Sequence, residues 1–64
     1  MATFFKVEIE TDNAAFDGRR VPEIRRILRD VCDRLSELEP GDRLKLRDVN
    51  GNRVGFAELT TEED

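Results

Sequence analysis

The stretch DVNGNRVGFAEL, residues 48–59, comes nearest to a chemical site by residue type and spacing. Asp48, Asn50 and Asn52 follow the D-x-N-x-N pattern with which a calcium-binding loop begins. Such a loop also needs glycine at its sixth position and a bidentate glutamate at its twelfth. Those positions hold Arg53 and Leu59. The motif is therefore interpreted as a turn, and no metal site is expected there.

The other residue types also argue against catalysis. The chain has no histidine or tyrosine, and its one serine, Ser36, has no base near it in the pattern. General bases and nucleophile–base pairs are thus missing, and one cysteine without histidine cannot form a tetrahedral zinc site. VNGNRVG lacks the lysine of a phosphate-binding loop. The sequence predicts a protein that is not an enzyme and has no cofactor.

Cys32 lies at the edge of an apolar helical stripe and has two interpretations. The favoured one is a small apolar core residue beside Leu28 and Leu35, and the other is a reactive thiol. A single cysteine cannot form an internal disulfide, and no apolar run is long enough for a signal peptide or a membrane span. These features predict a reduced, cytoplasmic protein that does not bind membranes.

Positive charge crowds the start of the predicted helix, where the helix macrodipole disfavours it. The residues offered for partner binding are Arg19, Arg20, Arg25 and Arg29. One account is a binding site for an anionic partner, either nucleic-acid phosphate or an acidic protein patch. The other is internal pairing at i,i+4 spacing, through Arg26–Asp30, Arg29–Asp33 and Asp30–Arg34, with the acidic tail folded over the arginines. The sequence leaves both accounts open.

A second candidate surface is the outer face of the predicted sheet. It comprises Phe4, Arg43, Lys45, Arg47 and Arg53. The favoured interpretation is a ladder of cross-strand pairs with Glu8 and Glu10. The alternative is a platform for single-stranded nucleic acid, for which one aromatic residue is few.

Three periodic segments must position these residues. Residues 3–11 alternate as a half-buried strand, with Phe5, Val7 and Ile9 on one face. Residues 22–38 predict a helix that begins at Pro22 and ends before Pro40 and Gly41. Its apolar stripe comprises Ile24, Ile27, Leu28, Val31, Leu35 and Leu38. Residues 43–59 predict a hairpin, and residues 60–64 form an acidic tail.

The hairpin turn decides which side chains face inward. A two-residue Asn50-Gly51 turn would leave Val54 and Phe56 on the face opposite Leu44 and Leu46. A three-residue turn with Gly51 in the left-handed region sets Leu46 opposite Val54 and Leu44 opposite Phe56. The second register is predicted because turn chemistry and apolar pattern then agree. The fold class is α+β, a single β-α-β-β domain with a three-stranded, antiparallel sheet and one helix on one face.

The segments TDNAAF, ILR and LRDVNGNRVG occur in the chain in this order. In these segments the chain resembles a group of short, uncharacterised proteins of bacterial and phage genomes, and the similarity covers nearly its whole length. The resemblance implies a bacterial or phage source. Because that group has no established activity, it implies no functional residue.

Composition narrows the class of partner. Charged residues make up 41% of the 64 residues, and the formal net charge is −4. Negative charge disfavours non-specific contact with nucleic acid and anionic membranes. We therefore expect a small accessory or regulatory protein that binds another protein, such as a phage-derived inhibitor of host defence. The alternatives are a nucleic-acid binder using the helix-start arginines, and a structural homodimer formed through open sheet edges.

Overall fold

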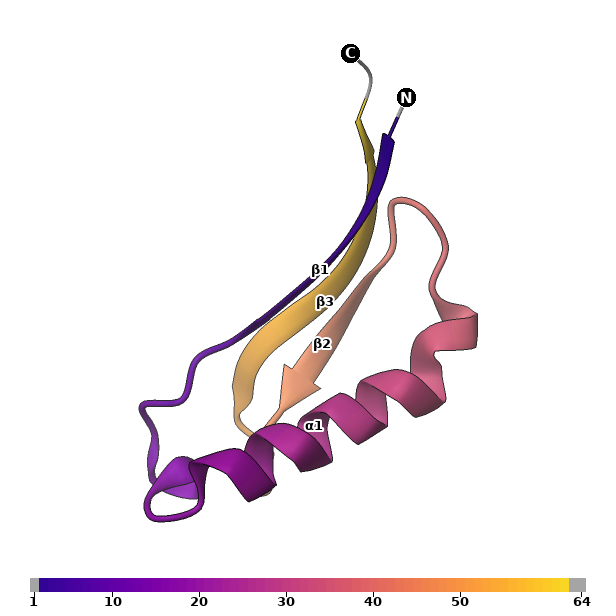
Figure 1. Cartoon of the computed structure of the whole chain (residues 1–64). Coiled ribbons are helices and arrows are strands. Elements are labelled where there is room, and N and C mark those ends of the chain that lie inside the picture. Colours follow the sequence, from indigo (N-terminus) through magenta and orange to yellow (C-terminus); the bar gives the residue numbers. More distant parts are fainter. Residues whose placement is uncertain (1, 63–64) are drawn as a thin grey trace.

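A computed structural model describes residues 2–62 and shows an α+β fold with one long helix beneath a three-stranded antiparallel sheet (Figure 1). The strands are β1 (Ala2–Ile9), β2 (Arg43–Arg47) and β3 (Arg53–Glu62), and the helix is α1 (Arg20–Arg34). Two short 3-10 helices, η1 (Ala14–Phe16) and η2 (Leu35–Glu37), flank α1. The strand order is β1-β3-β2. Fold class and antiparallel order are as predicted.

The ends of the elements differ from the prediction. α1 begins at Arg20, so Pro22 falls later in the first turn, where a missing N–H still breaks no helical hydrogen bond. β3 continues to Glu62, which lies opposite Ala2. Residues 60–62 of the expected acidic tail therefore belong to the sheet, far from the start of α1 (Figure 1). Residues 63–64 of that tail lie outside the described residues.

The hairpin turn has the predicted form. The Asp48 N–H donates to the Asn52 carbonyl at 2.9 Å, and the Gly51 N–H donates to the Asp48 carbonyl at 3.0 Å. Gly51 has a φ of 84°, in the left-handed region that glycine enters without steric cost. The turn is therefore the three-residue form.

Beyond the turn the predicted register is wrong. Arg47 lies opposite Arg53 and Leu46 opposite Gly55, which leaves Val54 as the extra residue of a β-bulge. The bulge reverses the inside–outside alternation of β3, so Leu44 lies opposite Ala57 rather than Phe56. Ala57 is 0% exposed, whereas Phe56 lies on the outer face opposite Lys45. Phe56 is thus not a core residue.

The core lies between α1 and the inner face of the sheet, and Phe16 of η1 contributes to it. Its buried apolar members are Ala15, Phe16, Ile27, Val31, Leu46, Val54 and Ala57. Burial of a large aliphatic side chain stabilises the fold by about 1.5–3 kcal/mol, and only Ile27 and Leu46 are large and fully buried. The core therefore contains few large side chains that are fully buried.

α1 covers only part of the inner face. Two of its arginines reach the backbone of β2: Arg26 donates to the Arg47 carbonyl at 3.0 Å and Arg34 to the Lys45 carbonyl at 3.5 Å. The ribbon formed by β1 and β3 extends well past α1 towards the chain termini (Figure 1). On that part of the inner face Phe5 remains 48% exposed. The helix therefore lies along β2 and leaves the inner surface of β1 partly open.

Candidate functional site

The D-x-N-x-N motif is organised around the carboxylate of Asp48, which is buried at the hairpin turn. One oxygen, Oδ1, accepts the N–H groups of Asn50 and Asn52, each at 2.9 Å. The other, Oδ2, accepts the side-chain amides of Asn13 at 2.8 Å and Asn52 at 3.3 Å. These donors fix the turn and join it to the loop after β1. The motif is structural, and it connects the TDNAAF and LRDVNGN segments.

A second buried carboxylate, Glu23, joins α1 to the same turn. Its Oε1 accepts the Arg26 Nε–H at 2.6 Å, and its Oε2 accepts the Val49 N–H at 2.8 Å. The Arg26–Glu23 pair takes the place of the Arg26–Asp30 pair expected from the sequence. Glu23 is only 5% exposed although it stands on the first turn of α1. It carries negative charge where the helix macrodipole favours it.

Both carboxylates have lowered pKa values. The hydrogen bond from Arg26 is the largest influence on the pKa of Glu23, and with the Val49 N–H it outweighs the opposing effect of burial. Burial alone would raise the pKa of Asp48, but the hydrogen bonds from Asn52, Asn50 and Asn13 together lower it. Each group is therefore ionised at neutral pH and fully engaged by donors. Neither is available as a general acid.

Stability is expected to fall in acid because of these two groups. A carboxylate whose pKa is lower in the folded than in the unfolded chain stabilises the fold above its unfolded value, about 4, and that contribution is lost as the pH falls through the folded value. Thermal unfolding between pH 7 and pH 2 should therefore show a decreasing melting temperature below about pH 4. Glu23→Gln should weaken this dependence, while Glu39→Gln, at an exposed site, should leave it unchanged. Equal slopes for Glu23→Gln and the unmodified chain would contradict the assignment.

The four arginines offered for partner binding all lie exposed along the start of α1. Within residues 2–62, Arg19, Arg20, Arg25 and Arg29 make no ion pair. Of the three expected i,i+4 pairs, only Arg34–Asp30 forms, at 3.3 Å. Asp33 and Glu37 are likewise exposed near the other end of the helix. In the described part of the chain, internal pairing does not explain the inverted charge order.

The outer sheet face carries the expected cations, but with different neighbours. Phe56 and Glu58 lie opposite Lys45 and Arg43, where the predicted register would place Gly55 and Ala57. Arg43 pairs with Glu58 at 2.9 Å, and its guanidinium lies 4.3 Å from the centre of the Phe56 ring. Lys6 approaches the same ring at 5.9 Å. The cations therefore cover the ring, which disfavours base stacking on this face.

The other residues that the sequence analysis assigned to the outer sheet face are Phe4, Arg47 and Arg53. Phe4 is 50% exposed. Arg47 faces Arg53 across the strands and donates to the Gly51 carbonyl at 3.0 Å. The expected ladder of Glu8 and Glu10 with these cations does not form among residues 2–62, where Glu58 is the acid that pairs.

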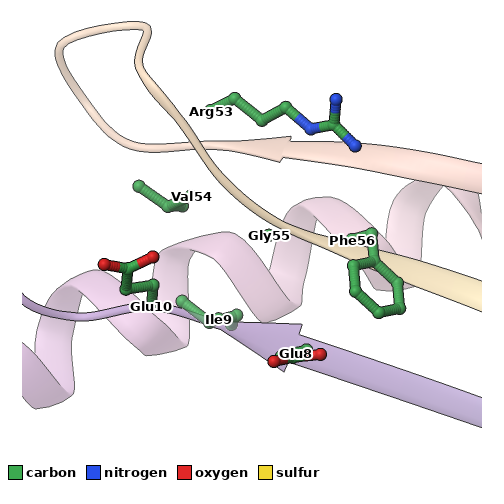
Figure 2. A pocket seen from close by; sticks show the side chains of 7 residues that line it. All are labelled: Glu8, Ile9, Glu10, Arg53, Val54, Gly55 and Phe56. Atoms are coloured by element: carbon green, nitrogen blue, oxygen red, sulfur yellow. The ribbon is translucent and has the colours of Figure 1, made fainter.

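A hollow opens beside the end of β1 and the bulge of β3 (Figure 2). Glu8 of β1 and Glu10, just after that strand, line one side, and Arg53 of β3 lines the other. Gly55 lies between them, where the backbone of β1 comes too close to leave room for a side chain. Because the lining carries charges of both signs and no buried polar group without a partner, the hollow does not select an anion or a cation.

The most unusual surface is the side of α1 that turns away from β2, named here the exposed flank. It comprises the exposed Val21, Leu28 and Cys32 of α1, the half-buried Ile24, which also packs against the core, and Leu35 at the start of η2. Val21 is 62% exposed, Leu28 41% and Leu35 46%. Val21, Ile24, Leu28 and Cys32 line a hollow of about 320 Å³ together with Arg25 and Arg29. An apolar surface bordered by charged residues is typical of a protein interaction site.

The exposed flank corrects two predictions. Leu28 and Leu35 were assigned to the core because they belong to the apolar stripe of the helix, yet both are exposed. Cys32, favoured as a core residue beside them, is exposed as well. The stripe is wider than the surface that β2 and the bulged part of β3 can cover. Phe5 of β1 shares this outcome, since it faces inward beyond the reach of α1.

Comparison of the chain with protein-family models, with curated proteins and with solved structures found no match. Neither α1 nor the two 3-10 helices in the described residues have the length and apolar character of a membrane span. Residues 2–62 also contain no group of three or more Cys, Asp or Glu side chains placed to hold a metal ion.

Proposed function

We propose that the chain is a small, non-enzymatic accessory protein that binds another protein through the exposed flank of α1. The observation that carries the proposal is an apolar surface from Val21 to Leu35, left uncovered by the sheet and bordered by Arg25 and Arg29. Arginine beside apolar side chains is common in protein interfaces. A partner of matching chemistry presents apolar side chains next to carboxylates.

A protein partner explains the surface better than nucleic acid does. Phosphate binding needs positive charge, which the arginines supply, but it does not need the apolar side chains between them. The net charge of −4 also opposes binding to a polyanion. Because the chain resembles short bacterial and phage proteins, we propose that it acts in the cytoplasm as a regulator, such as an inhibitor of host defence.

The proposal predicts that charge reversal on α1 abolishes partner capture without unfolding the chain. Tagged Arg25→Glu/Arg29→Glu should lose the proteins that the unmodified chain retains from a lysate of its native cell. Lys45→Glu/Arg53→Glu makes the same change in charge on the outer sheet face and should retain them. Circular dichroism should show that both variants are folded, because all four side chains are exposed.

The same variants test the nucleic-acid alternative. Fluorescence anisotropy with short single- and double-stranded DNA and RNA at low salt should show no binding by the unmodified chain. Binding that Arg25→Glu/Arg29→Glu abolishes would assign the arginines to phosphate instead. Identical protein capture by both charge-reversed variants would overturn the proposed interface.

A further inference from the structure

We propose that a second copy of this chain pairs with the free edge of β1, with the two β1 strands antiparallel and centred on Val7. The two three-stranded sheets then form one continuous sheet about a two-fold axis. This inference goes beyond the proposed function, because it uses a different surface and leaves the exposed flank of α1 free for its own partner.

The two edge strands of the sheet differ in how their outward hydrogen-bonding groups are used. The strand order β1-β3-β2 leaves one side of β1 and one side of β2 without a neighbouring strand. On β2, Arg26 and Arg34 donate to the carbonyls of Arg47 and Lys45. Within the described chain, no side chain bonds to the backbone of β1 in this way. The edge of β1 is therefore an open template for a further strand.

Alternate residues of β1 present their backbone to this free edge. Just after the strand, the Glu10 N–H donates to the Val54 carbonyl of β3 at 2.8 Å. In an antiparallel ladder, the N–H and C=O groups of successive residues point to opposite sides of the strand. The even-numbered residues of β1 thus bond to β3, and Phe5, Val7 and Ile9 present their N–H and C=O groups to the free edge.

The order of side chains along β1 is self-complementary. Its segment FKVEI alternates apolar and charged residues, with Val7 at the centre. A two-fold axis at Val7 sets Phe5 opposite Ile9 of the second copy, and Lys6 opposite Glu8 of the second copy. An isologous contact requires this property, because the same segment meets itself. Both charged side chains are exposed and make no ion pair within residues 2–62, so they are available for these cross-strand pairs.

Other registers pair the charges less well. A two-fold axis at Lys6 or at Glu8 sets two like charges directly opposite each other, which is unfavourable. An axis at Phe5 leaves Lys6 opposite Phe4 and Glu8 opposite Ala2, so neither charge is paired. Parallel strands in register would place like charges side by side. The charge order therefore selects the antiparallel pairing.

The faces of the joined sheet also agree. Val7 and Ile9 pack against the core in each copy, so a two-fold axis perpendicular to the sheet places both α1 helices on the same face. α1 lies along β2 and contacts its backbone, whereas the free edge of β1 is at the opposite side of the sheet (Figure 1). Neither helix therefore blocks the second strand. Phe5, which α1 leaves 48% exposed, gains Ile9 of the second copy as a neighbour on the inner face.

The side chains favour a second copy over a strand of another protein. Main-chain pairing at a sheet edge gives affinity with little specificity, and the alternating side chains decide which strand fits. A strand that matches β1 needs an acidic residue opposite Lys6, a basic residue opposite Glu8 and apolar residues between them. The antiparallel β1 of a second copy supplies all of these.

Sedimentation velocity from micromolar to millimolar concentration tests the inference. The unmodified chain should form a dimer. Lys6→Glu should weaken it by about tenfold or more, because an acidic residue then lies opposite Glu8 in both symmetric pairs. Lys45→Glu makes the same change of charge on β2, away from this edge, and should leave the dimer unchanged. Circular dichroism should show that both variants are folded, because both side chains are exposed.

Charge exchange and cross-linking identify the contact. Lys6→Glu/Glu8→Lys inverts both pairs and should restore the dimer, with the net charge kept at −4. In a Cys32→Ser background, Val7→Cys should form a disulfide-linked dimer on mild oxidation, because opposite residues of a hydrogen-bonded pair have Cα atoms about 5.5 Å apart. Thr3→Cys lies away from the axis and should not form this link.

A folded chain that stays monomeric at millimolar concentration would overturn the inference. A dimer that Lys6→Glu does not weaken, or that gives no Val7→Cys cross-link, would overturn it as well, since the contact would then lie elsewhere. Arg25→Glu/Arg29→Glu should leave this dimer intact while it loses the protein bound to the exposed flank. Failure of the dimer and failure of the proposed function are thus distinguishable.

Discussion

Replacing Asp48 with alanine is expected to remove most of the stability of the chain. Asp48 accepts two backbone N–H groups and the amides of Asn13 and Asn52 while buried at the turn. Alanine leaves those donors, which now make part-buried hydrogen bonds, without an acceptor in the protein. A donor that is left unpaired and shielded from water costs about 1–3 kcal/mol. The melting temperature should fall by roughly 15 °C or more, since a domain of this size loses about 4–8 °C per kcal/mol. Thermal unfolding followed by circular dichroism measures the change.

Two further variants show whether the cause is the hydrogen-bond network. Asp48→Asn keeps one accepting oxygen but turns an N–H₂ group towards the donors, so it should be intermediate between alanine and the unmodified chain. Asp17→Ala removes an exposed carboxylate and should shift the melting temperature by only a few degrees. An Asp48→Ala protein that melts within about 5 °C of the unmodified chain would show that the turn forms without this carboxylate.

The parts of the fold that could be predicted are those that depend on residues close together in the sequence. The turn at Asp48 and Gly51 depends on side-chain and backbone preferences within five residues, and these are visible in the sequence. The apolar periodicity of α1 and β1 is also local, and it gives their type and approximate ends. Strand order followed from the general preference for antiparallel pairs.

The bulge at Val54 depends on non-local geometry, so the apolar pattern concealed it. Val54 and Phe56 alternate as a regular strand would, and only Gly55 between them signals an irregularity. One extra residue then exchanged Phe56 for Ala57 in the core. The four outer cations kept their face because the bulge lies on β3 between Arg53 and Gly55, beyond Arg53 itself.

The candidate site was predicted only in its charged part. Arg25 and Arg29 lie exposed where the helical period places them. The apolar part was missed because the sequence predicted that the whole apolar stripe of the helix, including Leu28 and Leu35, would be buried. How much of a stripe is covered depends on the number of strands beneath it and on where the helix lies across them. Leu28 is exposed because α1 lies along β2, which is fixed by contacts of Arg26 and Glu23 that the sequence does not reveal.

Gly55→Ala should be as damaging as the loss of Asp48, although the change adds only a methyl group. A Cβ atom at Gly55 would overlap the carbonyl oxygen of Glu8 and lie 2.9 Å from its carbonyl carbon and 3.0 Å from the Cα of Ile9. All three atoms belong to the backbone of β1, so no side-chain rotation can relieve the overlap. β1 and β3 must separate at this point, and the melting temperature should fall by roughly 15 °C or more.

Comparison with Gly41→Ala distinguishes the overlap with the backbone of β1 from a general effect of losing a glycine. Gly41→Ala meets nothing within 4 Å and suffers only the strain of a φ of 96°, about 1–2 kcal/mol. In Gly55→Ala, amide exchange should accelerate first at Glu10, whose N–H donates to the Val54 carbonyl at 2.8 Å, while the Asn52 N–H bound to Asp48 stays protected at the turn. If Gly55→Ala melts no lower than Gly41→Ala, then β1 and β3 do not approach closely at the bulge, and the reversal that places Ala57 inside has another cause.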